Sequence, residues 1–339
     1  MVDFMPDSQH AAHDGPGSSI KITTREDRTV VMAVLLRVVR LFRKQLNPSA
    51  PKHEDGSIKL KSPKARVRPC TTSHRTVCDI HIYDIVPPRT PTKAPTRRIY
   101  YIAGSSWQQA PSGQHWWVCA QLALALPDTI ISIISPPLAP NNTASSSFPW
   151  CMRLYRELLR LASDAGERVT LMGDSSGANM VLCMVMEALR QDAETPRSPP
   201  APQPVSIMTI SPSTDLTRSN PDIETLRAVD PLLSPEAIRA TARAWLGSDV
   251  DPADRIVSPI NADFTLLAQS GIRVHGVTAG YDVLSPDGLV FREKLARHGV
   301  RGEWLHWAKQ MHCFVLTAPY RLREGREGFE WVVDVLRRD

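Results

Sequence analysis

The chain has 339 residues, 42% of them hydrophobic, which is enough to bury a substantial core as one large α/β domain or two smaller ones. Its 40 basic and 35 acidic residues are spread along the chain apart from one short basic run at 59–68, so the net charge of +5 does not favour nucleic-acid binding. The six cysteines show no CxxC pair and no metal-ligand spacing, and the amino terminus lacks a secretory signal pattern, so we expect free thiols, no metal and a cytoplasmic location.

The first predicted element is an amphipathic helix that begins near Thr29, in the sequence TVVMAVLLRVVRLFRKQL. Its uninterrupted apolar run covers only residues 30–36, whereas a membrane-spanning helix needs about 20 residues, so we expect no stable membrane insertion. One stripe of the helix is apolar: Val31, Leu35, Val38 and Phe42. We expect this stripe to pack on the protein's own surface, with contact to a membrane interface as the alternative.

From Cys78 onward, short β-rich runs alternate with segments of helical length. The predicted strands begin at 78, 98, 129, 168, 205, 272 and 302, and helices begin near 112, 150, 176, 261 and 285. This alternation predicts an α/β fold in which a mostly parallel sheet is covered by helices on both faces.

Two stretches interrupt the alternation. Residues 190–205 are proline-rich and predict a surface connection, and residues 214–258 contain helical segments but no strand. We therefore predict an amino-terminal segment at 1–77 that carries a cap helix, and a catalytic domain at 78–339 with a cap insertion at about 214–258.

The segment TLMGDSSGANMVL passes from a strand pattern to a helix pattern at Ser175. Gly173 and Gly177 complete G-x-S-x-G, the nucleophile elbow, in which glycines two residues either side of the serine give the tight turn room. The alternative is an ordinary structural turn. The motif occurs once in the chain and lies between a predicted strand and a predicted helix, which favours a catalytic serine.

A nucleophilic serine needs a base and an acid that orients the base, in the chain order serine, acid, histidine. His312 follows the last predicted strand, and Asp282 follows the strand before it. Asp287 is the rival acid, but SPDG predicts the start of the next helix, with Ser285 as its cap.

These motifs resemble those of the hormone-sensitive-lipase-like group of α/β-hydrolases, also called the alpha/beta hydrolase fold-3 family. GDSSGAN is similar to GDSAGGN, SPPLAPNNTASSSFPW to YRLAPE...FP, SPSTDLT to SPW-D-L, YDVLSPDG to D-x-L-x-D, and MHCF to HxF, over the chain from about Cys78 to its end. The resemblance implies an α/β-hydrolase fold with a helical cap and no cofactor. It also implies that Ser175 is the nucleophile, Asp282 the acid and His312 the base.

The oxyanion loop departs from the family pattern. Where relatives carry HGGG, this chain has Ala103, Gly104, Ser105 and Ser106. We expect the oxyanion hole to consist of the backbone NH groups of Ser105, Ser106 and Ser176, and one misplaced donor would cost about 3 kcal/mol of transition-state stabilisation.

Three tryptophans lie near this loop: Trp107, Trp116 and Trp117. They either pack on the sheet or wall an acyl or polyketide-sized pocket. We expect Trp107 and Gly104 to contact the substrate.

The resemblance implies a serine carboxylic-ester hydrolase that forms an acyl-enzyme on a small apolar or polyketide-type ester. SSWQQ and PSGQHW resemble the fungal branch of the family, whose members often act in secondary metabolism. An acyltransferase, a thioester or lactone hydrolase and a cyclase are alternatives within the enzyme class, and a small-molecule receptor is the alternative outside it. The expected partner is a small-molecule ester or acyl substrate, and the oligomeric state is left open, a homodimer included.

Overall fold

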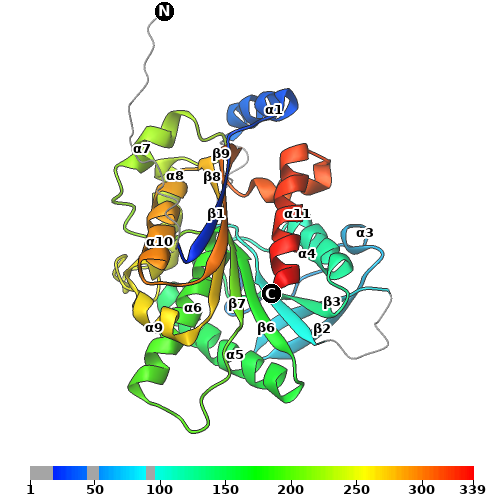
Figure 1. The fold of residues 1–339 in the computed structure, drawn as a ribbon, viewed down its shortest axis with the longest axis vertical. Coiled ribbons are helices and arrows are strands. Elements are labelled where there is room, and N and C mark those ends of the chain that lie inside the picture. Colours follow the sequence, from blue (N-terminus) through cyan, green and yellow to red (C-terminus); the bar gives the residue numbers. More distant parts are fainter. Residues whose placement is uncertain (1–17, 44–52, 89–95) are drawn as a thin grey trace, which may run out of the picture.

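Nine strands form one sheet in the computed structural model, which describes residues 18–43, 53–88 and 96–339 (Figure 1). The strand order is β1-β9-β8-β7-β6-β4-β5-β3-β2. The bounds are β1 Ile20–Arg25, β2 Thr71–Val77, β3 Ile80–Val86, β4 Arg97–Ile102, β5 Thr129–Ser135, β6 Arg168–Asp174, β7 Ser206–Ile210, β8 Arg273–Tyr281 and β9 Gly302–Met311. Seven of these strands match the predicted runs.

Along this order the pairing is parallel from β1 to β5. At the other edge, β3 pairs antiparallel with β5, and β2 pairs antiparallel with β3. This confirms the predicted mostly parallel sheet. The sheet, however, contains strands from both sides of the expected boundary at Cys78. Its two edge strands, β1 and β2, come from the amino-terminal segment. Both are half-exposed strands without a continuous apolar run, so the sequence pattern did not reveal them.

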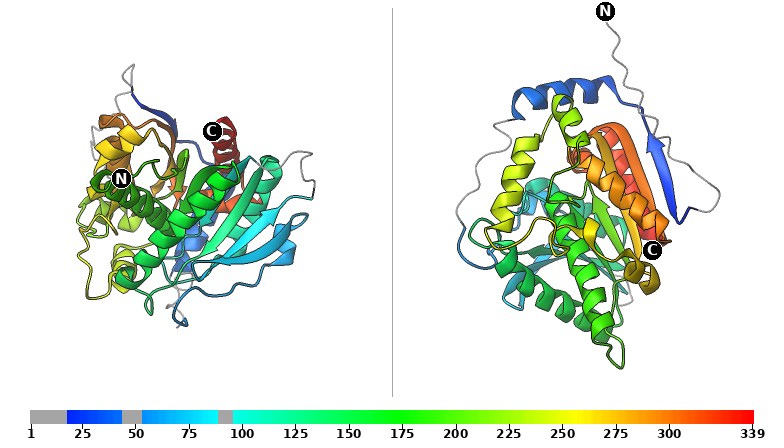
Figure 2. Two further views of the ribbon diagram at one scale, coloured as in Figure 1. Left: turned by 90° about the horizontal axis from the view of Figure 1, so that it is seen from below. Right: turned by 90° about the vertical axis from the view of Figure 1, so that its left-hand side faces the viewer.

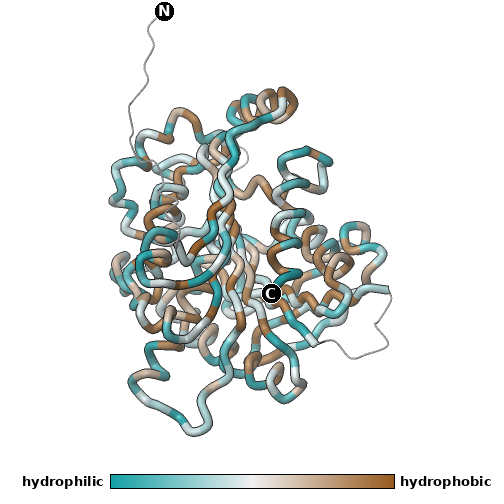
Figure 3. The backbone as a smooth tube through the Cα atoms, in the orientation of Figure 1, coloured by the Kyte–Doolittle hydropathy of each residue, from teal (hydrophilic) through white to brown (hydrophobic). Residues whose placement is uncertain are grey.

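Helices cover both faces of the sheet, as predicted (Figures 1 and 2). One face packs against α5 Ala144–Asp164, α6 Ser175–Glu194, α9 Phe264–Ser270 and α10 Ser285–Arg297. The other packs against α3 Lys64–Val67, α4 Gly113–Ala125 and α11 Arg323–Arg338. Apolar stretches run along the central strands in Figure 3, which is consistent with strands buried on both sides.

The insertion at 214–258 contains three short helical elements and no strand: α7 Asp222–Thr225, η1 Leu226–Ala228 and α8 Pro235–Leu246. Helix α8 begins as its sequence predicts, because the Ser234 hydroxyl accepts a hydrogen bond from the Ala237 NH and Pro235 occupies the first turn. Its apolar side is buried, including Ile238 and Trp245.

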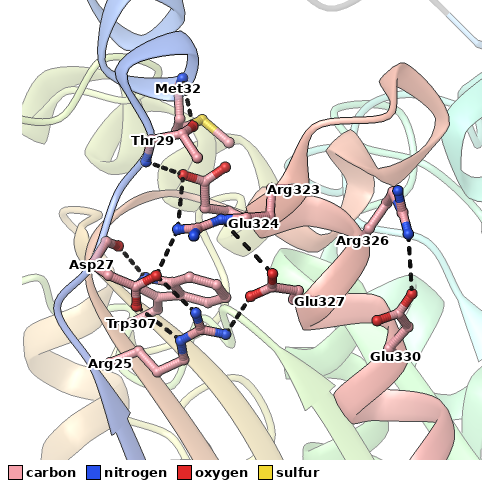
Figure 4. Close-up of polar contacts among 10 residues, drawn as sticks. All are labelled: Arg25, Asp27, Thr29, Met32, Trp307, Arg323, Glu324, Arg326, Glu327 and Glu330. Atoms are coloured by element: carbon pink, nitrogen blue, oxygen red, sulfur yellow. Dashed lines mark hydrogen bonds and ion pairs between the residues drawn. The ribbon is translucent and has the colours of Figure 1, made fainter.

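The predicted amino-terminal helix is α1 Val30–Leu41, and it is fixed at its base (Figure 4). The buried Glu324 carboxylate accepts a hydrogen bond from the Thr29 NH at 2.5 Å, and Trp307 Nε1 donates to the Asp27 carbonyl at 2.7 Å. At the other end of the helix, Arg43 Nη1 lies 3.2 Å from the carbonyl oxygens of Asp230 and Leu233. Helix α1 is therefore held between α11 and the insertion.

The prediction of which side of α1 packs was wrong. Met32 and Leu36 are buried, whereas Val31, Val38 and Phe42 of the predicted stripe are exposed. The helix is apolar around most of its circumference, so the sequence period alone did not distinguish the two sides. Within the part of the chain that the structure describes, no helix is both long enough and apolar enough to cross a bilayer.

Candidate active site

Ser175 stands at the turn where β6 ends and α6 begins, at the centre of the carboxyl edge of the sheet. Its φ of +51° is a strained conformation for a residue with a side chain. Both neighbouring glycines are required sterically. A Cβ on Gly177 would lie 2.0 Å from the Ile102 carbonyl oxygen, and one on Gly173 would lie 2.6 Å from the Gly177 carbonyl carbon. The backbone thus has the geometry that the G-x-S-x-G pattern predicts.

The structure brings Ser175, His312 and Asp282 together from three separate strand ends. His312 Nε2 lies 3.0 Å from Ser175 Oγ, and His312 Nδ1 lies 2.8 Å from Asp282 Oδ2. Asp282 is fully buried, and its other oxygen accepts a hydrogen bond from the Leu284 NH at 2.9 Å. The rival acid Asp287 does not contact His312, and its Oδ2 lies 3.8 Å from Arg218 Nη1 instead. Ser285 occupies the first turn of α10 without capping it.

Burial would lower the pKa of His312, but the adjacent Asp282 carboxylate outweighs it and holds this pKa well above its ordinary value. With Nδ1 donating to Asp282, Nε2 of the neutral ring is left to accept the Ser175 hydroxyl proton.

A second carboxylate supports this corner, and the sequence did not point to it. Asp230 accepts hydrogen bonds from the NH groups of Leu232, Leu233 and Val283, each at 2.8 Å. Val283 directly follows Asp282, so Asp230 ties the insertion to the loop that carries that carboxylate. Burial, together with the nearby charge of Asp282, raises the pKa of Asp230 to about 7.

The loop after β4 has an unusual backbone. Ser105, Ser106 and Trp107 have φ values of +128°, +58° and +60°, so three consecutive residues with side chains occupy conformations that glycine adopts easily. The Gly104 NH donates to Asp174 Oδ1 at 2.9 Å, and the Trp107 NH donates to Ser176 Oγ at 3.1 Å. Among the described residues, the NH groups of Ser105 and Ser106 have no acceptor, which leaves them available to a ligand.

Asp174 connects this loop to the elbow. Its carboxylate is buried and accepts hydrogen bonds from the Tyr101 hydroxyl at 2.6 Å and from the Gly104 NH, and its other oxygen lies 3.3 Å from His115 Nε2. Burial opposes ionisation, but His115 and these donors outweigh it and lower the pKa of Asp174. The sequence contains Asp174 within its motif, but nothing in the pattern indicates these distant partners.

A cavity of about 440 Å³ opens onto Ser175 and His312. This volume is typical of sites for small organic molecules. Its walls combine the loop after β4 with α8 and its flanks, and the apolar lining residues include Leu232, Leu233, Ile238, Leu284 and Leu316.

Only one of the three tryptophans near the loop reaches this cavity. Trp107 lines it and stacks on Trp245 of α8, with ring centroids 5.9 Å apart and planes inclined by 8°. Trp116 packs edge-on against Tyr83, and Trp117 packs against Phe329. Gly104 does not line the cavity, because its neighbours are Asp174 and Ser175 and its NH is already bonded.

This sheet, with a strand-to-helix elbow at the centre of its carboxyl edge, defines an α/β-hydrolase. A family model described as alpha/beta hydrolase fold matches residues 99–316, which is more than half of the chain. The chain therefore belongs to this alpha/beta hydrolase family, in agreement with the resemblance of its motifs.

The individual proteins that resemble this chain share only 16–26% of its residues in the aligned parts. An esterase of Acinetobacter venetianus is 26% identical over 206 residues, which are 61% of this chain and 63% of that protein, so the match spans less than two thirds of the curated relative. Carboxyl esterase 2 of the fungus Tuber melanosporum superposes with a TM-score of 0.74 at 16% identity, covering 91% of this chain and 97% of the other. An esterase of the bacterial hormone-sensitive lipase family gives 0.73 at 18%, covering 92% and 99%. These structures share the fold.

Proposed function

We propose that the protein is a carboxylic ester hydrolase in which Ser175 is the nucleophile, His312 the general base and Asp282 the orienting acid. The observation that carries the proposal is the unbroken relay Ser175–His312–Asp282, at 3.0 Å and 2.8 Å, opening onto a cavity. The esterase names of the relatives support the same reaction class.

In the first half of the reaction, Ser175 Oγ attacks the ester carbonyl carbon while His312 Nε2 takes its proton. The imidazolium is stabilised by Asp282. The tetrahedral intermediate then collapses and the bond between the carbonyl carbon and the leaving oxygen breaks. His312 gives its proton to that oxygen, so the leaving group departs as an alcohol. In the second half, water attacks the acyl-enzyme with His312 again as base, releasing the acid and free Ser175.

The negative oxygen of the intermediate would be bound by the NH groups of Ser105, Ser106 and Ser176. The unengaged NH groups of Ser105 and Ser106 support this role. A single such donor contributes about 3 kcal/mol to transition-state stabilisation, a factor of about a hundred or more in rate. The Gly104 NH donates to Asp174 and the Trp107 NH donates to Ser176 Oγ, and these two hydrogen bonds hold both ends of this loop.

The substrate we propose is a small ester whose acyl part lies against the apolar wall of α8, under a cap formed by α1 and the insertion at 214–258. The Trp107–Trp245 stack and the cavity volume support an acyl group of moderate size. An intermediate of secondary metabolism is one such ester.

The test is pre-steady-state hydrolysis of p-nitrophenyl acetate and p-nitrophenyl hexanoate. We expect a burst of about one p-nitrophenolate per chain with the wild-type protein, followed by slower turnover. Ser175→Ala should lose the burst and about 10⁴-fold or more of the rate. Ser163→Ala, on the exposed side of α5, is the matched control and should behave as wild type. Equal rates for Ser175→Ala and wild type would reject the proposal.

A further inference from the structure

Among the residues that the structure describes, Arg218 is the one arginine that lines the cavity, and two nitrogens of its guanidinium have no hydrogen-bond acceptor. Only 2% of its side chain is exposed. Nη2 donates to Ser213 Oγ at 2.7 Å, but Nε and Nη1 have no hydrogen-bond acceptor among the described residues. The Ser213 NH in turn donates to the Ser175 carbonyl at 3.3 Å. The guanidinium is thus connected to the proposed nucleophile through a single intervening residue, Ser213.

The ion pair with Asp287 does not satisfy this arginine. Nη1 lies 3.8 Å from Asp287 Oδ2, which is too long for a hydrogen bond, and that oxygen also lacks a hydrogen-bond partner. Burial lowers the pKa of Arg218 to about 10, and it raises the pKa of Asp287 to about 6, although the two charges attract. The pair is therefore costly to bury, and a buried pair of this kind is weak evidence for stability.

The backbone adds a further cost. Arg218 has a φ of +52°, a left-handed conformation that is unfavourable for a residue with a side chain. A strained backbone, a buried charge and two unmet donors coincide at one residue on the cavity wall. Such coincidences are typical of ligand-binding positions rather than of packing.

The chemistry of the guanidinium restricts what it can bind. It has donors only, so its ligand must present a hydrogen-bond acceptor, which in an acyl ester is an oxygen. Three carboxylates already act on Arg218, those of Asp287, Asp215 and Asp282, against one neighbouring cation, Arg239, so negative charge is in excess around it. An additional negative charge would be repelled by this excess, whereas an uncharged carbonyl would satisfy the donors without it. The surrounding wall is apolar, which suits a hydrocarbon chain that carries such a carbonyl.

We propose that Arg218 binds an uncharged carbonyl oxygen of the substrate, separate from the scissile ester, and so selects oxo-substituted acyl esters over plain hydrocarbon ones. The inference rests on the proposed ester hydrolysis and names its substrate class.

The test compares matched p-nitrophenyl esters: 4-oxopentanoate with pentanoate, and 5-oxohexanoate with hexanoate, with mono-p-nitrophenyl glutarate as the carboxylate arm. For the wild-type protein we expect a higher kcat/KM on at least one oxo ester than on the plain ester of the same chain length. The kcat/KM on the glutarate should not exceed that on the plain esters. Arg218→Met should reduce that oxo-to-hydrocarbon ratio by about tenfold or more, because a charged hydrogen bond is lost.

Two further variants keep the result interpretable. Arg218→Met/Asp287→Asn removes the carboxylate that the single change would strand, and it should show the same reduced ratio. Arg239→Met is the matched control, because Arg239 is a nearby, partly exposed arginine paired with Glu224 that does not line the cavity. It should keep the wild-type ratio.

The outcomes separate the two proposals. Hydrolysis of the esters with no oxo preference in the wild type, or with an unchanged ratio in both Arg218 variants, overturns the role of Arg218 and leaves the hydrolase intact. A preference for the glutarate overturns the assignment of an uncharged ligand. Release of p-nitrophenolate from none of the esters rejects the hydrolase, and this inference with it.

Discussion

Replacing Ser105 by glycine should make the protein more stable than replacing it by alanine. Both changes remove the hydroxyl, but only glycine relieves the φ of +128° that the loop imposes at this position. Strain of this kind costs about 1–3 kcal/mol. Glycine loses about 0.4–1 kcal/mol relative to alanine through the greater freedom of the unfolded chain. The expected net advantage of Ser105→Gly over Ser105→Ala is therefore about 0.5–2 kcal/mol.

The measurement is urea unfolding of both variants and the wild type, followed by tryptophan fluorescence, with the midpoints compared at equal slope. Ester turnover is measured in parallel, and Ser105→Gly should retain activity because the NH donor remains. If the glycine variant were less stable than the alanine variant by 0.4–1 kcal/mol, as at an unstrained site, the backbone of this loop would not be strained and the account of the oxyanion loop would be wrong.

Three further predictions concern the elbow and its base. Gly177→Ala should abolish soluble expression or activity, because its Cβ would lie 2.0 Å from a carbonyl oxygen of β4. The control is Gly166→Ala, at a residue with φ +68° and no atom within 4 Å of the added Cβ. It should lower the free energy of unfolding by only about 1 kcal/mol. Tyr101→Phe should cost about 1.5–3 kcal/mol in urea unfolding, since it removes a 2.6 Å hydrogen bond to the buried carboxylate of Asp174; a change below 0.5 kcal/mol would contradict that role. Because His312 must be neutral to act as base and its pKa is raised, kcat/KM should fall as pH drops, with a midpoint above 6.5; a midpoint below 6 would contradict the raised pKa.

Much of the fold could be predicted from the sequence because its central strands are continuous apolar runs separated by helix-length segments. The edge strands β1 and β2 could not, since an edge strand is half exposed and lacks that pattern. The burial of α1 could not be predicted for a related reason. A helix that is apolar on several sides has no single stripe that fixes its orientation, and the side that packs is decided by its anchors at Glu324 and Asp230.

Within the site, Ser175, Asp282 and His312 could be proposed from strand ends and motif order, because each follows directly after a recognisable strand. The residues that support them are distant in sequence and carry no local pattern. Asp230 reaches the Asp282 loop from 53 positions away, counted to Val283, and Tyr101 reaches Asp174 from 73. Arg218 was not singled out either, since its strain and its unmet donors exist only in the folded chain.

The most direct test of the account is to inactivate the protein with ethyl p-nitrophenyl hexylphosphonate, which loses p-nitrophenolate when a serine attacks its phosphorus, and to locate the adduct by peptide mass spectrometry. The account predicts one phosphonyl group per chain, on Ser175, with loss of ester hydrolysis in proportion to labelling and no labelling of Ser175→Ala. Full loss of hydrolysis with the adduct on another residue, or undiminished hydrolysis with Ser175 fully labelled, would contradict it.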